Sequence, residues 1–256
     1  MRQAKATAFP KKPTLRLEDI SADFEVRRHP GARRLTLRVS RTRRAVIVTI
    51  PVQCDLDEAG TFLGRHIDWV RERLDRLPDP VPFLHGAVMP LRGVPHRVVF
   101  TGARNTRIVR TSAGQGHAPG HWPEIHVPGS DDTAPKRLRR WLFDEAKRDL
   151  DARVAAHTGS LRVKALRVAV RDQTSRWGSC STTALLSFSW RLVLAPAHVL
   201  DYVAAHEVAH LAEMNHGPRF WALVERIFPE FEEAKSWLQI FGPDLHRYGA
   251  ANSEKA

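Results

Sequence analysis

The chain has 256 residues, of which 43% are hydrophobic, and a formal net charge of +12. This length allows one large domain or two small ones, and the apolar share is sufficient for a packed core. No apolar stretch has the length of a membrane span or the pattern of a secretory signal. Two cysteines are too few for a disulfide framework or a cysteine-rich zinc ribbon. We therefore expect a cytoplasmic protein that does not enter a membrane.

The basic charge has two interpretations. A sequence pI near 10.6 is compatible with a nucleic-acid or nucleotide partner. Arginine greatly outnumbers lysine, however, and a GC-rich genome produces the same bias through codon usage. We expect a basic, solvated surface and keep the polyanion partner as the alternative, which predicts binding that weakens steeply with added salt.

The N-terminal half is expected to be rich in β-structure. Residues 1–23 are polar and rich in Pro and Lys, which is typical of a flexible tail, and residues 24–110 form the β-rich region. Apolar residues alternate over 33–40 and 43–51, which predicts the two strands of a hairpin. Helical spacing predicts one amphipathic helix over 56–77. Shorter strand-like segments are 87–93, 96–102, 107–111 and 124–129.

A composition change marks the predicted domain boundary. Residues 111–134 mix Gly, Pro, Ser and Asp and are expected to form a linker. This stretch also holds His117, His121 and His126. We do not expect these histidines to bind a metal, because a loop rich in Gly and Pro offers ligands no rigid frame.

Residues 135–250 are expected to form a second domain with clearer periodicity. Strands are predicted at 164–172 and 185–194, and amphipathic helices at 134–159, 217–228 and 229–242. Between them, Pro196 is placed to open one further helix, because proline is well tolerated in a first helical turn.

That further helix contains the stretch "HEVAHLAEMNH", residues 206–216. His206 and His210 lie one helical turn apart, so both imidazoles can bind one metal ion. Glu207 points to the side of this pair, where it can take a proton from a metal-bound water. Asn215 and Gly217 are good helix terminators, which allows His216 to return to the metal.

Three neutral imidazoles leave one position open, which is typical of catalytic rather than structural zinc. An alternative third ligand is a downstream carboxylate, with His216 hydrogen-bonded behind it. The candidate carboxylates are Glu213, Glu225 and Glu230.

Four motifs occur in one order and at close spacing. They are "RWGSCS" at Arg176–Ser181, "WRLVLAP", "LDYVAAHEVAHL" and "NHGPRFW". Together they resemble the YgjP-like metallopeptidase domain, a relative of the WLM and SprT-like zincins, over about residues 135–248. The resemblance implies an α+β fold: a zincin-like metallohydrolase domain with a short mixed sheet, an active-site helix and a strand beside the cleft, preceded by a smaller β-rich region.

The resemblance also implies roles for individual residues. It assigns His206, His210 and His216 as Zn²⁺ ligands and Glu207 as the general base and acid. The histidine spacing equals that of the metzincins, but Glu213 stands where they have glycine, so the turn there must differ. SprT-like relatives often carry a C-terminal zinc ribbon, and the lack of cysteines for one counts against a DNA-repair protease.

The segment Arg176–Ser181 has two interpretations. Arg176 is a candidate catalytic residue, because a guanidinium near the open metal position can stabilise an oxyanion or bind a phosphate. The alternative is a tight turn at Gly178 with Trp177 packed inside. Cys180 is not expected to be a nucleophile, because the metal already supplies one.

The sequence therefore predicts a zinc-dependent hydrolase, with a metallopeptidase as the first interpretation. The strand at 185–194 is expected to pair with an extended peptide at the sheet edge. One alternative is a nucleotide phosphoanhydride hydrolase with Arg176 binding phosphates, although the chain has no P-loop. A second alternative is a metal-stabilised nucleic-acid-binding module, against which the presence of Glu207 argues, since binding alone needs no base.

Overall fold

The computed structural model describes residues 22–40, 45–103, 107–111 and 122–250. The chain divides between Asp79 and Pro80 into two compact units. The linker predicted at 111–134 does not coincide with this division. Val98 before that segment and Ile125 and Val127 within it share one hydrophobic core with the C-terminal helices, so the compact division falls earlier in the chain.

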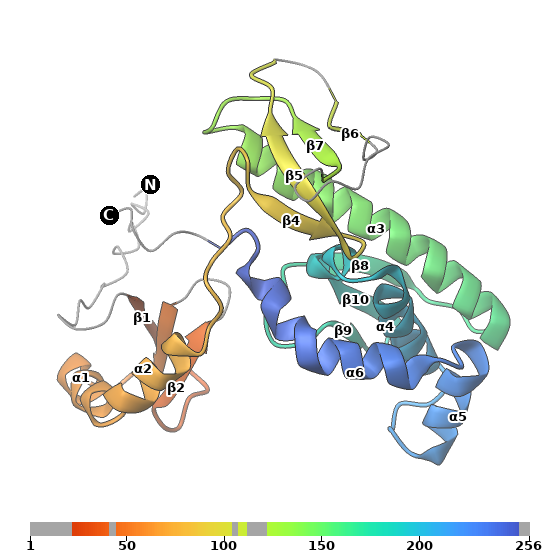
Figure 1. Ribbon diagram of the computed structural model, residues 1–256. Helices are drawn as coiled ribbons and strands as arrows, with labels where there is room; N and C mark the ends of the chain where they lie inside the picture. Colours follow the sequence, from red (N-terminus) through yellow and green to blue (C-terminus); the bar gives the residue numbers. More distant parts are fainter. Residues whose placement is uncertain (1–21, 41–44, 104–106, 112–121, 251–256) are drawn as a thin grey trace, which may run out of the picture. The chain divides into compact units, whose positions relative to one another are not determined.

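The first unit is a small mixed sheet with two helices (Figure 1). Its strands are β1 (Asp23–Arg28), β2 (Thr36–Ser40) and β3 (Ala45–Ile50). The order is β1-β3-β2, with β1 parallel and β2 antiparallel to β3. The predicted hairpin strands are confirmed, and residues 41–44 between them lie outside the described residues. The strand β1 was not predicted.

The helix predicted over 56–77 is two helices, α1 (Leu56–Arg65) and α2 (Ile67–Asp75). His66 separates them with a φ of −113° and a ψ of 13°. Its ring Nδ1 lies 2.8 Å from the carbonyl oxygen of Phe62. A side chain that bonds to its own helix in this way competes with continued helical geometry, which explains the break.

The second unit begins with a four-stranded sheet. Its strands are β4 (Val88–Leu91), β5 (Val94–Phe100), β6 (Val109–Arg110) and β7 (Glu124–Val127). The order is β4-β5-β7-β6, and only the β5–β7 pair is parallel. All four short segments predicted from the sequence are strands. His126 lies in β7 beside Glu124, whereas His117 and His121 lie outside the described residues.

The long helix α3 (Ala134–Leu161) follows the predicted segment and continues two residues past Gly159. It ends at Arg162, which adopts a left-handed conformation with a φ of 55°. Its buried stripe contains Leu138, Leu142, Ala146, Leu150 and Val154. In Figure 1, α3 runs along the second unit beside β8 and α4.

The sheet nearest the candidate site has three strands, β8 (Arg167–Arg171), β9 (Gly178–Cys180) and β10 (Leu185–Ser189). Their order is β8-β10-β9. β10 runs parallel to β8 and antiparallel to β9. β10 is therefore the central strand and has no free edge.

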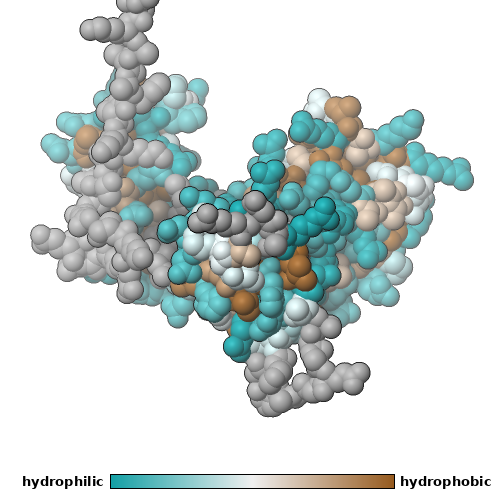
Figure 2. Space-filling view, turned by 90° about the horizontal axis from the view of Figure 1, so that it is seen from above, coloured by the Kyte–Doolittle hydropathy of each residue, from teal (hydrophilic) through white to brown (hydrophobic). Residues whose placement is uncertain are grey.

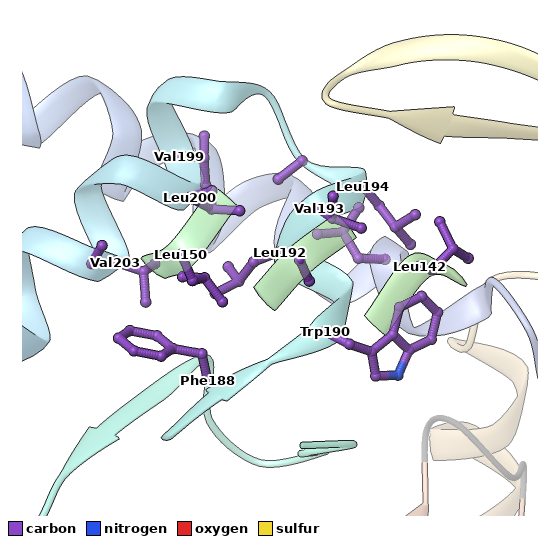
Figure 3. Packing of buried hydrophobic residues seen from close by; sticks show 14 of the residues in the cluster. Leu142, Leu150, Phe188, Trp190, Leu192, Val193, Leu194, Val199, Leu200 and Val203 are labelled. Carbon is purple, nitrogen blue, oxygen red and sulfur yellow. The ribbon is translucent and has the colours of Figure 1, made fainter. Parts of the chain in front are cut away.

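The strand predicted at 185–194 is correct only in its first half. After Ser189 the chain turns into the 3-10 helix η1 (Trp190–Leu194), and the Ser189 hydroxyl accepts a hydrogen bond from the Arg191 N–H. Every residue of η1 is buried, and several pack against α3 (Figure 3). Because all sides of this segment are buried, the alternation of apolar residues did not reveal its conformation.

Three α-helices and a 3-10 turn complete the unit: α4 (Ala197–Ala209), α5 (Pro218–Ile227), α6 (Phe231–Phe241) and η2 (Gly242–Arg247). All three predicted C-terminal helices are thus present. No helix among the described residues is both long and apolar enough to cross a membrane.

On the face shown in Figure 2, hydrophilic residues cover most of the coloured surface and hydrophobic residues occur in smaller groups. Several arginines of the second unit form ion pairs. Arg92 contacts both Glu145 and Asp149, at 2.7 and 2.8 Å. Arg153 lies 3.2 Å from Asp201. Part of the basic charge is therefore compensated locally.

Candidate active site

The histidine motif lies at the end of α4. His206 and Glu207 occupy the last turn of the helix, and His210 is its C-cap residue. The helix then ends in a tight turn in which the Ala212 and Glu213 N–H groups both donate to the Ala209 carbonyl. The helix therefore ends before Asn215 and Gly217, the terminators that the sequence indicated, and the chain then brings His216 back to His206 as expected.

The turn brings the three histidines together. The Nε2 atoms of His206 and His216 lie 3.1 Å apart. The imidazole atoms of His206, His210 and His216 that can bind a metal all lie within 4.8 Å of one another. Among the described residues, Glu213, Glu225 and Glu230 do not belong to this group.

His210 is oriented by the backbone. Its Nδ1–H donates to the Glu213 carbonyl oxygen at 3.1 Å, which leaves Nε2 to face the other two imidazoles. The Glu213 carboxylate in turn accepts a hydrogen bond from the Asn215 N–H at 3.3 Å. A hydrogen bond of this kind fixes the tautomer and the ring orientation of a ligand histidine. The sequence signalled the departure at Glu213 but not this role.

The imidazoles are held in the form that binds metal. Burial, followed by the neighbouring His210 and His216, lowers the pKa of His206 to about 3. Burial also lowers the pKa of His210 below its ordinary value. Both rings are therefore neutral at pH 7, and a neutral imidazole is the ligand form for a divalent metal.

Glu207 is 5% exposed. Burial raises the pKa of its carboxyl to about 8, and the Arg176 charge acts in the opposite direction. Its Oε2 is buried and has no hydrogen-bond partner among the described residues. A carboxyl oxygen without a partner, beside three convergent imidazoles and with a pKa near neutral, is suited to exchange a proton with a bound ligand or water.

Gly178 makes room for that carboxyl. A Cβ atom at this position would lie 2.5 Å from Glu207 Oε1 and 2.6 Å from Glu207 Cγ. Gly178 lies in the strand β9, where it pairs with Phe188 of β10, and its φ is not positive. The glycine is therefore required for space. The sequence did not reveal this role, because it depends on a contact between residues 29 positions apart.

A cavity of about 310 Å³, here called the site cavity, contains the histidines and Glu207. Its remaining walls are Arg176, Gly178, Ser179, Cys180 and Met214. Trp177 points elsewhere and stacks on His246, with ring centroids 5.0 Å apart. The tight turn expected at Gly178 is absent, because this residue lies in β9, whereas Trp177 packs on His246 away from the cavity. Arg176 lines the cavity, and its catalytic role stays a prediction.

The strand beside this cavity is β9. The Trp177 carbonyl accepts from the Ser189 N–H, and the Ser181 N–H donates to the Leu185 carbonyl. Hydrogen-bonding groups alternate along an antiparallel strand, so the N–H and C=O groups of Gly178 and Cys180 point to the free edge. The expectation that residues 185–194 offer this edge is wrong, because β10 is paired on both sides.

An ionic group that includes the buried Arg191 holds the segment that leads into β9. Asp172 accepts hydrogen bonds from Trp190 Nε1 at 3.1 Å and from the guanidinium groups of Arg191 and Arg139. Burial raises the pKa of Asp172, but the two arginines and Trp190 outweigh it and hold that pKa below its usual value. Arg191 is 1% exposed, so this carboxylate compensates a buried charge.

Comparison with known proteins points to a family of metallopeptidases. The model of the family described as "YgjP-like, metallopeptidase domain" matches residues 33–241. No curated protein matches at a significant level. Among solved structures, the metallopeptidase zymogen of Pyrococcus abyssi abylysin is 21% identical to this chain in sequence. The match covers 36% of this chain and 92% of abylysin, with a TM-score of 0.33. Because the family model spans well over half of the chain, the protein belongs to the YgjP-like metallopeptidase family.

Proposed function

We propose that the protein is a zinc-dependent peptidase in which Glu207 transfers the protons. The family supports a metal-dependent peptidase. The convergence of three imidazoles beside a buried carboxyl carries the proposal for the metal and the mechanism.

The residues fit a zinc ion. Two nitrogen ligands at about 2.05 Å from a tetrahedral zinc lie about 3.3 Å apart. The Nε2 atoms of His206 and His216 are 3.1 Å apart, which agrees with this spacing. Three neutral nitrogen donors without a thiolate favour zinc with one open position. When bound, zinc supplies Lewis acidity toward the substrate carbonyl and lowers the pKa of water at the open position.

In this proposal Glu207 performs both proton transfers, and Arg176 stabilises the charge that develops on the substrate. Glu207 would accept a proton from the attacking water, and the oxygen of that water would bond to the scissile carbonyl carbon. Glu207 would later deliver that proton to the amine nitrogen as the C–N bond breaks. A nearby dication favours the ionised carboxylate, and this offsets the effect of burial on the pKa of Glu207. Arg176 is placed at the cavity wall to stabilise the negative charge on the former carbonyl oxygen.

The edge strand β9 supplies a place for the substrate backbone. The free N–H and C=O groups of Gly178 and Cys180 can pair with an extended peptide. This pairing would hold the scissile bond over the site cavity, which β9 lines.

The nucleotide alternative has weaker support. Among the described residues that line the site cavity, Arg176 is the only Lys or Arg. A triphosphate carries several charges and is usually bound by more than one cation or by a backbone cradle. The nucleic-acid alternative needs no proton-accepting carboxyl, whereas Glu207 lines the same cavity as the three histidines.

Zinc content and substrate class test the proposal together. The wild type and His210→Ala are dialysed with zinc, assayed for bound metal, and incubated with unfolded peptides and nucleoside triphosphates. We expect one zinc per chain, loss of zinc in His210→Ala, and cleavage of peptides only. His198→Ala is the matched control, because His198 is an exposed histidine on the same helix. Nucleotide turnover without peptide cleavage, or full zinc in His210→Ala, would refute the proposal.

A further inference from the structure

A cavity of about 390 Å³, here called the arginine cavity, lies between α3 and the start of α4. This volume is within the range of roughly 300–1,000 Å³ that is usual for small-molecule ligands. Its charged walls are Arg148, Asp149 and Arg153 of α3 and Arg92 of the turn between β4 and β5. The arginine cavity and the site cavity share no lining residue, so the two are separate candidate binding sites.

Arg92 is held in a fixed position at this wall. Its backbone N–H donates to the Val193 carbonyl at 2.7 Å, and its Nε and Nη2 both donate to the Asp149 carboxylate at 2.8 Å. Nη2 also donates to Glu145 at 2.7 Å. The remaining nitrogen, Nη1, is buried and has no hydrogen-bond partner among the described residues. Buried guanidinium nitrogens are normally hydrogen-bonded, so this donor is suited to an acceptor that a ligand brings.

The carboxylates around the arginine cavity already have partners, whereas the arginines have donors to spare. Each oxygen of Glu145, Asp149 and Asp201 lies against a guanidinium or imidazole nitrogen. A guanidinium carries five N–H groups. Arg148 and Arg153 each use one nitrogen in these contacts, and 67% and 51% of their side-chain surfaces are exposed. A ligand therefore meets donors here and must supply the acceptors itself.

The rest of the wall is apolar. It consists of six residues from α3, η1 and the start of α4: Ala152, Leu192, Val193, Ala195, Ala197 and Leu200. The helix α4 begins at Ala197 and has no acidic residue in its first turn, so the positive end of its dipole adds to the arginine charges. A small hydrated anion such as phosphate would gain nothing from the apolar wall, whereas an anion with an apolar body would bury carbon against it. A carboxylate also matches a planar guanidinium in two parallel hydrogen bonds.

We propose that the arginine cavity binds a carboxylate carried by an apolar body, either a free organic acid or the C-terminus of a peptide that ends in an apolar residue. Arg148 and Arg153 pair with the carboxylate, and the apolar wall covers the body. The histidines and Glu207 take no part in this site, so the inference does not depend on the proposed peptidase function.

Two matched pairs of probes test the charge requirement and identify the source of the carboxylate. Phenylbutyrate is compared with phenylbutanol, and N-acetyl-leucine is compared with N-acetyl-leucinamide. Acetate and inorganic phosphate supply charge without an apolar body. Dissociation constants are measured by calorimetry on the full-length, zinc-loaded protein. We expect at least one acid to bind about tenfold or more tightly than its uncharged partner, acetate and phosphate, and that acid identifies the source.

Substitutions on α3 locate the binding. Ala152→Phe fills the arginine cavity and should abolish binding of the acid. Arg153→Ala removes one donor group and should weaken binding by about tenfold. The matched controls are Ala155→Phe and Arg140→Ala, at exposed positions of the same helix that do not line the cavity, and both should bind the acid as the wild type does.

The outcomes decide the proposal whether or not the protein cleaves peptides. Acid binding that is lost in Ala152→Phe and weakened in Arg153→Ala, with both controls unchanged, would support the site. Equal affinities within both pairs of probes, acid binding that Ala152→Phe leaves unchanged, or no binding of any probe would overturn it. Acetate or phosphate that binds as tightly as the acids would also overturn it, since the apolar body would then contribute nothing.

Discussion

The substitution Gly178→Ala is expected to impair catalysis while zinc binding is retained. The added Cβ would lie 2.5 Å from Glu207 Oε1, whereas ordinary contact begins near 3.4 Å, so the carboxylate must move by about 0.9 Å. A misplacement of about 1 Å costs roughly 100-fold in rate, or about 2.7 kcal/mol of transition-state stabilisation. The histidines are untouched, so the zinc content should stay at one per chain.

The assay compares kcat for peptide cleavage with zinc content in the same preparations. Gly159→Ala is the matched control, because its added Cβ meets nothing within 4 Å, and its kcat should equal that of the wild type. Shortening the base offers a further check: Gly178→Ala should be less harmful in a Glu207→Asp background, since the shorter side chain relieves the clash. A wild-type kcat for Gly178→Ala would refute the spatial role of the glycine.

Three further substitutions test other parts of the structure. Asp172→Ala leaves the buried Arg191 without its carboxylate and should lower the free energy of unfolding by about 3 kcal/mol, measured by urea denaturation; an unchanged midpoint would contradict this. The pKa of Asp172 is lowered in the folded state, so its carboxylate stabilises the fold fully at pH values above the unfolded-state pKa. This stabilisation is lost as the pH falls through the folded-state pKa. The wild type and Asp172→Ala should therefore have similar free energies of unfolding in strong acid. Glu213→Ala keeps the backbone carbonyl that orients His210, and its zinc affinity in competition with a chelator should change by less than about tenfold; a loss of 10- to 100-fold would show that the side chain is required. Arg176→Ala should lower kcat by about 100-fold with KM little changed, and a change in KM alone would show that the guanidinium only binds substrate.

The sequence predicted most of the helical part of the site. The spacing of His206 and His210, one helical turn apart, together with the helix terminators on either side of His216, was enough to indicate convergent imidazoles. These features are local, and helical geometry determines them within a few residues. The structure brings the three histidines together as expected.

The parts that the sequence did not predict depend on long-range packing. The strand β9 has three residues, too few for a periodic signal, and its place at the sheet edge follows from pairing with β10. The alternation at 185–194 continued into η1, because that segment is buried on all sides. The space that Gly178 leaves for Glu207 joins two elements that are separate in the sequence.

The measurement that tests the central claim most directly is peptide turnover by zinc-loaded Glu207→Gln. The amide keeps the size of the side chain but cannot accept the proton, so we expect kcat to fall by about 100-fold to 10,000-fold with one zinc per chain retained. Glu233→Gln, at an exposed glutamate of α6, should behave as the wild type. Equal turnover by the wild type and Glu207→Gln at equal zinc content would contradict the proposed mechanism.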